Sequence, residues 1–174
     1  MNAEYLDSYD QTGEAALNIQ IEDMSRRGEG EVERLAMRIA AMDPWLRLGY
    51  SKESISVYLR NPEPDAGRLA IVVNDAVAGI LCLRYPWLRG VYIEMFALIP
   101  EVQGMGVGSR MLEYIEGEFQ SKTRNIWLLV SAFNGKAQGF YRAKGFLQIG
   151  KIKDFLVEGE DEILMRKTIQ PIKP

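Results

Sequence analysis

The stretch QGMGVGS, residues 103–109, decides the fold because it joins a predicted strand to a predicted helix. The strand before it, residues 91–98, is mostly apolar, and the helix after it carries an apolar stripe between Val107 and Phe119. Three alternating glycines let a ligand approach the main chain, and the first amides of a helix have no carbonyl partner within it. The turn therefore suits an anion such as a phosphate, the alternative being a turn that only reverses the chain.

Two common phosphate-binding motifs do not fit this turn. A P-loop continues with Gly-Lys-Ser or Gly-Lys-Thr, whereas Gly108 is followed by Ser109 and Arg110. A dinucleotide-binding turn needs an acidic residue at the end of the next strand, but that strand ends in LLVS, residues 128–131. A nucleotide-binding α/β protein is therefore disfavoured.

Hydrophobic periodicity on both sides of the turn predicts one α/β domain. Helices are expected to begin near residues 31, 51, 107 and 134, and strands near residues 17–21, 69–73, 77–83, 91–98, 126–130, 146–152 and 162–166. The strand–helix–strand order around the turn predicts a parallel pair, whereas Asn74 and Asp75 predict an antiparallel hairpin. Ser51 is expected to cap its helix without a full capping box.

The composition excludes several classes of protein. Of 174 residues, 47% are hydrophobic and 26% charged, which is typical of a globular protein with one core. The absence of histidine excludes serine–histidine–aspartate nucleophiles, histidine zinc sites and imidazole bases. The single cysteine, Cys82, excludes an intramolecular disulfide and cysteine-pair zinc sites, and it favours a reducing cytoplasm. We therefore expect a cytoplasmic protein that needs no metal.

Charge and hydropathy also limit the partners. A net charge of -3 without a dense cluster of Lys and Arg disfavours nucleic acid. No apolar run approaches the roughly 20 residues that span a bilayer, so no membrane segment is expected. Residues 1–16 are interpreted as a polar N-terminal extension, residues 17–168 as the domain and residues 169–174 as a C-terminal tail. The oligomeric state stays open, and a homodimer is compatible with the sequence.

A second motif, NGKAQGFYRAKGF at residues 134–146, follows the strand after the glycine turn. Together with Q-x-x-G-x-G at residues 103–108, it resembles the GNAT superfamily of acyl-CoA N-acyltransferases. The resemblance covers about residues 17–167 and is strongest between residues 91 and 146. It implies a mixed, mostly antiparallel, twisted sheet of about seven strands with a splayed parallel pair, and about four helices.

The resemblance also implies acetyl-CoA as the cosubstrate. Main-chain amides of residues 104–109 are expected to bind its pyrophosphate, and its pantetheine arm to pair with backbone near residues 96–98. An amide near Leu98 is expected to polarise the thioester carbonyl. The residues expected to bind the cosubstrate are Phe96, Ala97, Leu98, Gln103, Gly104, Met105, Gly106, Val107, Gly108, Ser109, Asn134 and Phe140.

Two residues of the second motif have alternative interpretations. Tyr141 resembles the general acid that protonates the leaving thiolate in this family, and the alternative is a tyrosine of the core beside Phe140. Asn134 matches an asparagine that contacts the cosubstrate, or it simply caps the helix that follows.

The proton acceptor is sought among carboxylates because the sequence contains no histidine. Glu94 interrupts the apolar strand at residues 91–98, and an acid there is costly unless it faces a cleft. A water relay, or a Glu94 that simply faces solvent, are the alternatives. Ribosomal-protein N-terminal-alanine acetyltransferases resemble the second motif but carry their glutamate base at the position of Leu129.

The sequence therefore predicts an N-acetyltransferase in which a primary amine, of a small molecule or a peptide, attacks acetyl-CoA directly. A ribosomal-protein-type N-terminal acetyltransferase and a non-catalytic acyl-CoA sensor are the alternatives. The aromatic segments at residues 42–45 and 85–87 either border the acceptor or anchor loops on the core.

Overall fold

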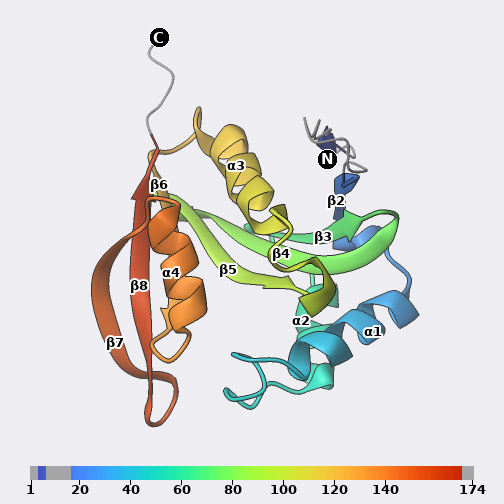
Figure 1. Cartoon of the computed structure of the whole chain (residues 1–174), viewed down its shortest axis with the longest axis horizontal. Helices are drawn as coiled ribbons and strands as arrows, with labels where there is room; N and C mark the ends of the chain where they lie inside the picture. Colours follow the sequence, from blue (N-terminus) through green and yellow to red (C-terminus); the bar gives the residue numbers. More distant parts are fainter. Residues whose placement is uncertain (1–3, 7–16, 170–174) are drawn as a thin grey trace.

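Eight strands form one mixed sheet in the computed structural model, which describes residues 4–6 and 17–169 (Figure 1). The strands are β1 (Glu4–Leu6), β2 (Ile19–Asp23), β3 (Ala66–Val73), β4 (Ala76–Trp87), β5 (Gly90–Leu98), β6 (Asn125–Ser131), β7 (Leu147–Val157) and β8 (Glu160–Thr168). Their order across the sheet is β1-β2-β3-β4-β5-β6-β8-β7. The mixed, mostly antiparallel sheet is therefore confirmed, with β1 as an additional short edge strand. The rest of the predicted N-terminal extension and residues 170–174 of the predicted tail lie outside the described residues.

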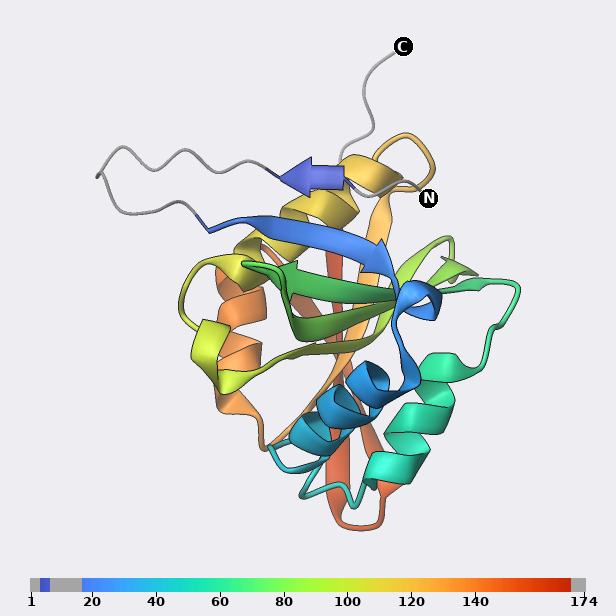
Figure 2. The same cartoon turned by 90° about the vertical axis from the view of Figure 1, so that its right-hand side faces the viewer.

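The helices lie on opposite sides of this sheet, α1 and α2 on one and α3 and α4 on the other (Figure 2). They are α1 (Glu29–Ala40), α2 (Lys52–Arg60), α3 (Val107–Phe119) and α4 (Gly135–Ala143), with the short 3-10 turns η1 (Met24–Arg26) and η2 (Pro100–Val102). The apolar stripe of α3 is fully buried at Val107, Met111, Leu112 and Ile115. Burial of these side chains stabilises α3 against the sheet, and the glycine turn, which directly precedes α3, is positioned with it. None of the described helices is long and apolar enough to cross a membrane.

The N-terminus of α2 corrects one prediction. The Ser54 amide donates to Ser51 Oγ at 3.0 Å, and the Ser51 amide donates to Ser54 Oγ at 3.1 Å. These two bonds complete a capping box, so the expectation of a cap without one was wrong. The usual signature has Glu or Gln three residues after the cap, and here a serine hydroxyl accepts the same bond.

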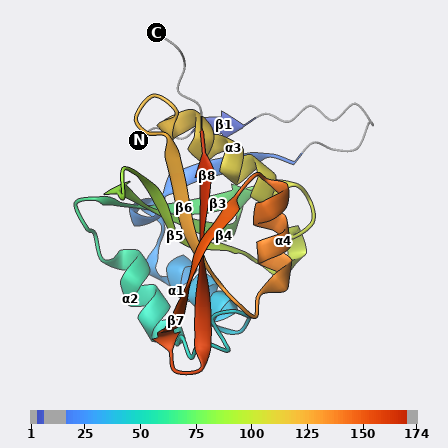
Figure 3. The same cartoon turned by 90° about the vertical axis from the view of Figure 1, so that its left-hand side faces the viewer.

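The parallel pair predicted around the glycine turn is β5 with β6, and it is short. Pairing runs only from Gly90–Ile93 to the matching residues of β6, after which the two strands diverge (Figure 1). Opposite β4, Leu83 pairs with Ile93 and Cys82 with Met95, so Glu94 is an additional, bulged residue. The predicted splay is confirmed, and it opens a gap between the carboxyl ends of β5 and β6. Figure 3 views the molecule from the β7 end of the sheet, where β8 pairs with β6 on the side away from β5.

Candidate active site

The glycine turn ends in a helix N-terminus that has no side-chain cap. Gly104 and Gly106 have φ values of +80° and +82°, which side chains other than glycine rarely adopt. Gly106 is the N-cap of α3, and the first bond of the helix runs from the Arg110 amide to the Gly106 carbonyl at 3.2 Å. The amides of residues 107–109 therefore have no carbonyl partner within the helix. They carry the positive end of the helix dipole and suit an anion.

A cavity of about 460 Å³ lies between this turn, the end of β5 and the start of α4, and we call it the turn cavity. Of the residues predicted to bind the cosubstrate, those that line it are Phe96, Ala97, Leu98, Gln103, Gly104, Gly106, Gly108, Ser109, Asn134 and Phe140. Met105 and Val107 do not line it, because Val107 is buried in the core and the Met105 side chain is 49% exposed. A Cβ on Gly108 would lie 3.2 Å from the Phe140 ring, so α4 packs tightly against the start of α3.

The amides of Phe96 and Leu98 point into the gap between β5 and β6. The Ile99 amide donates to the Ala78 carbonyl at 2.9 Å, which makes these two residues a hydrogen-bonded antiparallel pair. Successive residues of a strand direct their amides to opposite edges, so Leu98 and Phe96 direct theirs away from β4. β6 has already diverged there, and these donors are available to a ligand.

Gln103 links the end of β5 to α4. Its Nε2 donates to the Leu98 carbonyl at 2.9 Å, and its Oε1 accepts from Lys136 Nζ at 3.0 Å. Lys136 lines the turn cavity and brings a positive charge beside the uncapped amides. Lys136 was not among the predicted site residues, and its position inside the second motif was the one signal for it in the sequence.

A second cavity, of about 180 Å³, continues from the first into the gap between β5 and β6, and we call it the strand cavity. Tyr92–Phe96 of β5 and Leu128–Ser131 of β6 form two of its walls. The residues that line both cavities are Pro44, Trp45, Phe96, Asn134, Ala137 and Tyr141. Two ligands bound in these cavities would therefore meet beside Tyr141.

Tyr141 packs in the core, and it is also placed where the predicted general acid would have to lie. Its ring packs between Phe140 and Phe146, with centroids 5.3 and 5.5 Å away, and the residue is only 8% exposed. It also lines both cavities. Burial raises the pKa of the Tyr141 hydroxyl above its usual range, which keeps the phenol protonated and able to donate.

Asn134 caps α4, because its side chain accepts from the Ala137 amide at 3.1 Å. It also lines both cavities, and its contact with the cosubstrate stays a prediction.

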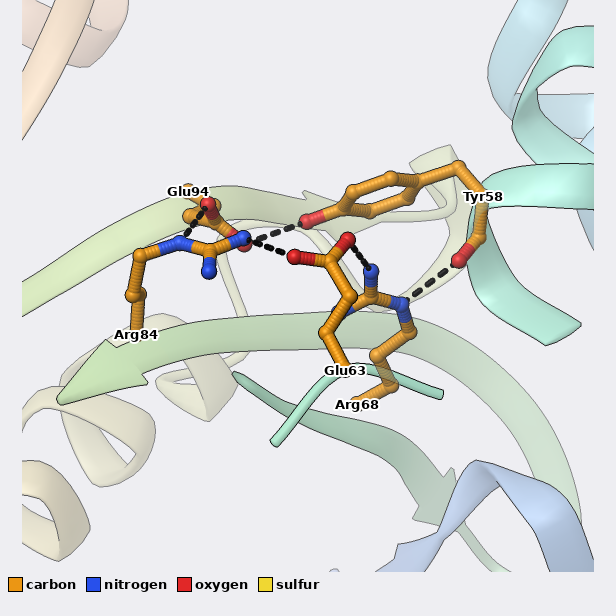
Figure 4. A network of polar contacts seen from close by, with 5 residues as sticks. All are labelled: Tyr58, Glu63, Arg68, Arg84 and Glu94. Atoms are coloured by element: carbon orange, nitrogen blue, oxygen red, sulfur yellow. Dashed lines mark hydrogen bonds and ion pairs between the residues drawn. The ribbon is translucent and has the colours of Figure 1, made fainter. Parts of the chain in front are cut away.

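Glu94 lies at the bulge of β5 within a network of charged side chains (Figure 4). Its Oε1 accepts from Arg84 Nε at 2.5 Å and its Oε2 accepts from the Tyr58 hydroxyl at 2.8 Å. Glu63 joins Arg84 to Arg68, at 2.6 and 2.8 Å. The Glu94 side chain is 16% exposed and lines the strand cavity with Tyr141. The structure therefore brings both predicted catalytic side chains to one cavity and fixes the carboxylate between two donors.

Glu162 is a residue of this cavity that the sequence analysis missed. It lies on β8 directly opposite Ser131 of β6, it is 2% exposed, and it lines the strand cavity. Among the described residues, no hydrogen-bond partner is found for its Oε1. Burial raises the pKa of this carboxyl. A hydrogen bond with Ser131 lowers the pKa in part, and the charge of Glu160 adds to the increase. The predicted strand begins at Glu162, directly after acidic residues of the turn, so only the register of β8 could have identified its side chain as facing the cavity.

The two aromatic segments, at residues 42–45 and 85–87, lie in different places relative to the cavities. Trp45 lines both cavities. Tyr85 instead donates its hydroxyl to the Lys122 carbonyl at 3.1 Å, and Trp87 stacks on Tyr92 at 4.6 Å. The segment at residues 85–87 therefore anchors β4 and lines neither cavity. No cluster of three or more His, Cys, Asp or Glu residues able to hold a metal is found in the part of the chain that the structure describes.

The chain is similar to known proteins in sequence and in fold. A family model described as "Acetyltransferase (GNAT) family" matches residues 31–146. Nourseothricin acetyltransferase is 25% identical over 60% of this chain and 66% of its own, with a TM-score of 0.56. The ribosomal-protein-S18-alanine N-acetyltransferase from Escherichia coli is 19% identical over 89% of this chain and 96% of its own, with a TM-score of 0.69. An aminoglycoside 6'-N-acetyltransferase complexed with coenzyme A is 17% identical over 88% and 99%, with a TM-score of 0.67. The latter two share the fold.

Proposed function

The chain belongs to the GNAT acetyltransferase family, and on this premise we propose that it moves an acetyl group from acetyl-CoA directly to a primary amine. The observation that carries the proposal is that the turn cavity and the strand cavity meet at Tyr141. One cavity has the donors for a phosphorylated carrier, and the other carries carboxylates suited to an amine. The acceptor is the amine of a small molecule or a peptide. A single buried thiol, Cys82, supports a reducing cytoplasm as its compartment.

The residues of the turn cavity fit the diphosphate of acetyl-CoA. Gly104 and Gly106 hold the loop in a left-handed conformation, and a Cβ on either would meet nothing within 4 Å, so the space before the α3 amides is open. The amides of residues 107–109 and Lys136 supply donors and positive charge. Acetyl-CoA supplies the acetyl group as a thioester when bound, and the Phe96 and Leu98 amides hold its arm in the gap.

In the transfer, the amine nitrogen forms a bond to the acyl carbon and the carbon–sulfur bond breaks. The Leu98 amide stabilises the oxyanion that develops on the carbonyl, which is typically worth about 2.7 to 4 kcal/mol for one donor. Tyr141 donates its hydroxyl proton to the departing sulfur, and its position where the cavities meet supports this role. Its protonated state is favoured by burial.

Glu94 receives the proton that the amine gives up, directly or through one water. Each carboxylate oxygen has two acceptor sites, so the bonds from Arg84 and Tyr58 leave one site on each oxygen for the incoming proton. The bulge directs the carboxylate into the strand cavity two residues before Phe96, beside the point of transfer.

Two measurements test the proposal. Titration calorimetry with coenzyme A should give saturable binding, and release of free thiol from acetyl-CoA should require both the enzyme and an amine. The Glu94→Gln variant should bind coenzyme A like the wild type and lose about 10²-fold or more in kcat. Binding without thiol release for any amine would replace the enzyme with an acyl-CoA sensor, and no binding at all would refute both.

A further inference from the structure

The strand cavity contains one carboxylate whose charge is not balanced by the protein. Its charged lining residues are Glu94 and Glu162, and no lysine or arginine is among the described residues that line it. Arg84 balances the charge of Glu94. The neighbouring cation, Arg47, binds Glu160 at 2.7 Å and lies 4.0 Å over the Phe133 ring. Glu162 thus has no ion-pair partner among the described residues, and it is only 2% exposed.

A buried carboxylate without a cation is costly, and proteins keep such groups where a ligand supplies the missing charge. Besides Tyr141, two phenol rings line the strand cavity with Glu162, those of Tyr50 and Tyr92. Burial is the main cause that raises the pKa of both hydroxyls. The charge of Glu162 is the second cause for Tyr50, and for Tyr92 it is the third, after Glu94. A carboxylate beside aromatic rings is the arrangement that attracts an ammonium group.

The two carboxylates lie on strands that flank β6 on either side. Neighbouring strands are about 4.8 Å apart, so β5 and β8 are separated by roughly 10 Å, and more where β5 diverges. Glu94 is two residues from Phe96, which lines both cavities, whereas Glu162 lies on the far side of β6. A volume of about 180 Å³ is below the roughly 300 Å³ of typical ligand pockets, so the enclosed group is small.

We propose that Glu162, beside Tyr50 and Tyr92, binds a second, non-reacting ammonium group of the acceptor, so that the preferred acceptor is a short diamine. This inference rests on the proposed acetyl transfer and names the substrate class of the strand cavity. The reacting amine lies beside Tyr141, and the other ammonium donates to the unpartnered Oε1 of Glu162. The single ion pair formed in this way balances the charge of the cavity.

Diaminobutane, with an amine at each end, and butylamine, with one, form a matched pair of acceptors for the test. The wild type should use diaminobutane with a kcat/KM about tenfold or more above that for butylamine, because a charge-assisted hydrogen bond is lost with the second amine. Glu162→Gln should abolish this preference. Glu158→Gln, which removes the same charge from an exposed residue of the β7–β8 turn, should keep it. Glu162→Asp keeps the charge and should retain part of the preference.

Calorimetry with diaminobutane and no acetyl-CoA gives a readout independent of turnover. Binding should be seen with the wild type and Glu158→Gln and be weakened about tenfold or more in Glu162→Gln. Equal use of the two amines by the wild type, or an unchanged preference in Glu162→Gln, would overturn the inference while leaving acetyl transfer intact. If no amine, these two included, leads to release of thiol from acetyl-CoA, the proposed function is instead refuted, whatever the calorimetry shows.

Discussion

Replacing Glu162 by Gln should make the protein more stable at neutral pH, and the size of the effect follows from the burial of this carboxyl. The residue is 2% exposed and has no ion-pair partner among the described residues. Glutamine keeps the buried polar atoms but removes the charge, and a buried group without its partner costs about 1 to 3 kcal/mol, with charged groups at the upper end. For a chain of this size, each kcal/mol shifts Tm by about 2 to 4 °C. Glu162→Gln is therefore expected to melt about 2 to 12 °C above the wild type at pH 7.

The same reasoning sets the pH dependence. Burial raises the pKa of Glu162 above the 4.5 of an unperturbed glutamate, so the folded state holds this proton more tightly than the unfolded chain. The cost of the buried charge is absent below pH 4.5 and develops as pH rises through the folded-state pKa. The stabilisation by Glu162→Gln should thus disappear near pH 4. The groups facing Glu162 are Tyr50, Tyr92 and Ser131, which are neutral over this range, and Glu160.

Thermal unfolding followed by circular dichroism at both pH values, with Glu158→Gln as the control for loss of one exposed charge, measures this difference. A Glu162→Gln variant that melts below the wild type at pH 7, or that differs from it equally at pH 4 and pH 7, would refute the account of a costly buried charge.

Other perturbations address the turn and the acid. Tyr141→Phe keeps the ring packing against Phe140 and Phe146, so coenzyme A affinity and Tm should stay nearly unchanged. It should lower kcat by at least tenfold, and by about 10² to 10⁴-fold if Tyr141 makes the full contribution typical of a positioned acid. Undiminished turnover in steady-state kinetics would remove Tyr141 from the mechanism. Gly106→Ala places a side chain at φ +82°, so it should lower the free energy of unfolding by about 1 to 2 kcal/mol and weaken coenzyme A binding. Gly117→Ala, inside α3, should instead raise the free energy of unfolding by about 0.5 to 1 kcal/mol. Thermal melts in which both variants shift in the same direction would contradict this. Lys136→Ala should weaken coenzyme A binding up to about fivefold, and by less at high salt. Lys153→Ala, on β7, should leave this binding unchanged, and calorimetry at two ionic strengths distinguishes the two variants.

The local elements were predictable because short-range rules produce them. The stripe on α3 and the left-handed turn at Gly106 follow from side-chain spacing and from what glycine alone tolerates. The Asn74–Asp75 hairpin has both residues at positive φ, as turn chemistry predicts. The capping box of α2 was missed because its second acceptor is Ser54, a residue that the usual signature does not include.

The chemistry of the strand cavity was decided by the tertiary structure. Glu94 looked like a lone acid on an apolar strand, and its partners Arg84 and Tyr58 come from a neighbouring strand and from α2. Glu162 is the first residue of a predicted strand and follows an acidic turn, and only the pairing of β8 with β6 directs its side chain into the cavity. A shift of one residue in that register would direct Asp161 or Ile163 there instead. Sequence alone thus determined the glycine turn and the transfer motif, while strand register and the divergence of β5 from β6 decided which charges face the acceptor, because both depend on contacts between residues far apart in the chain.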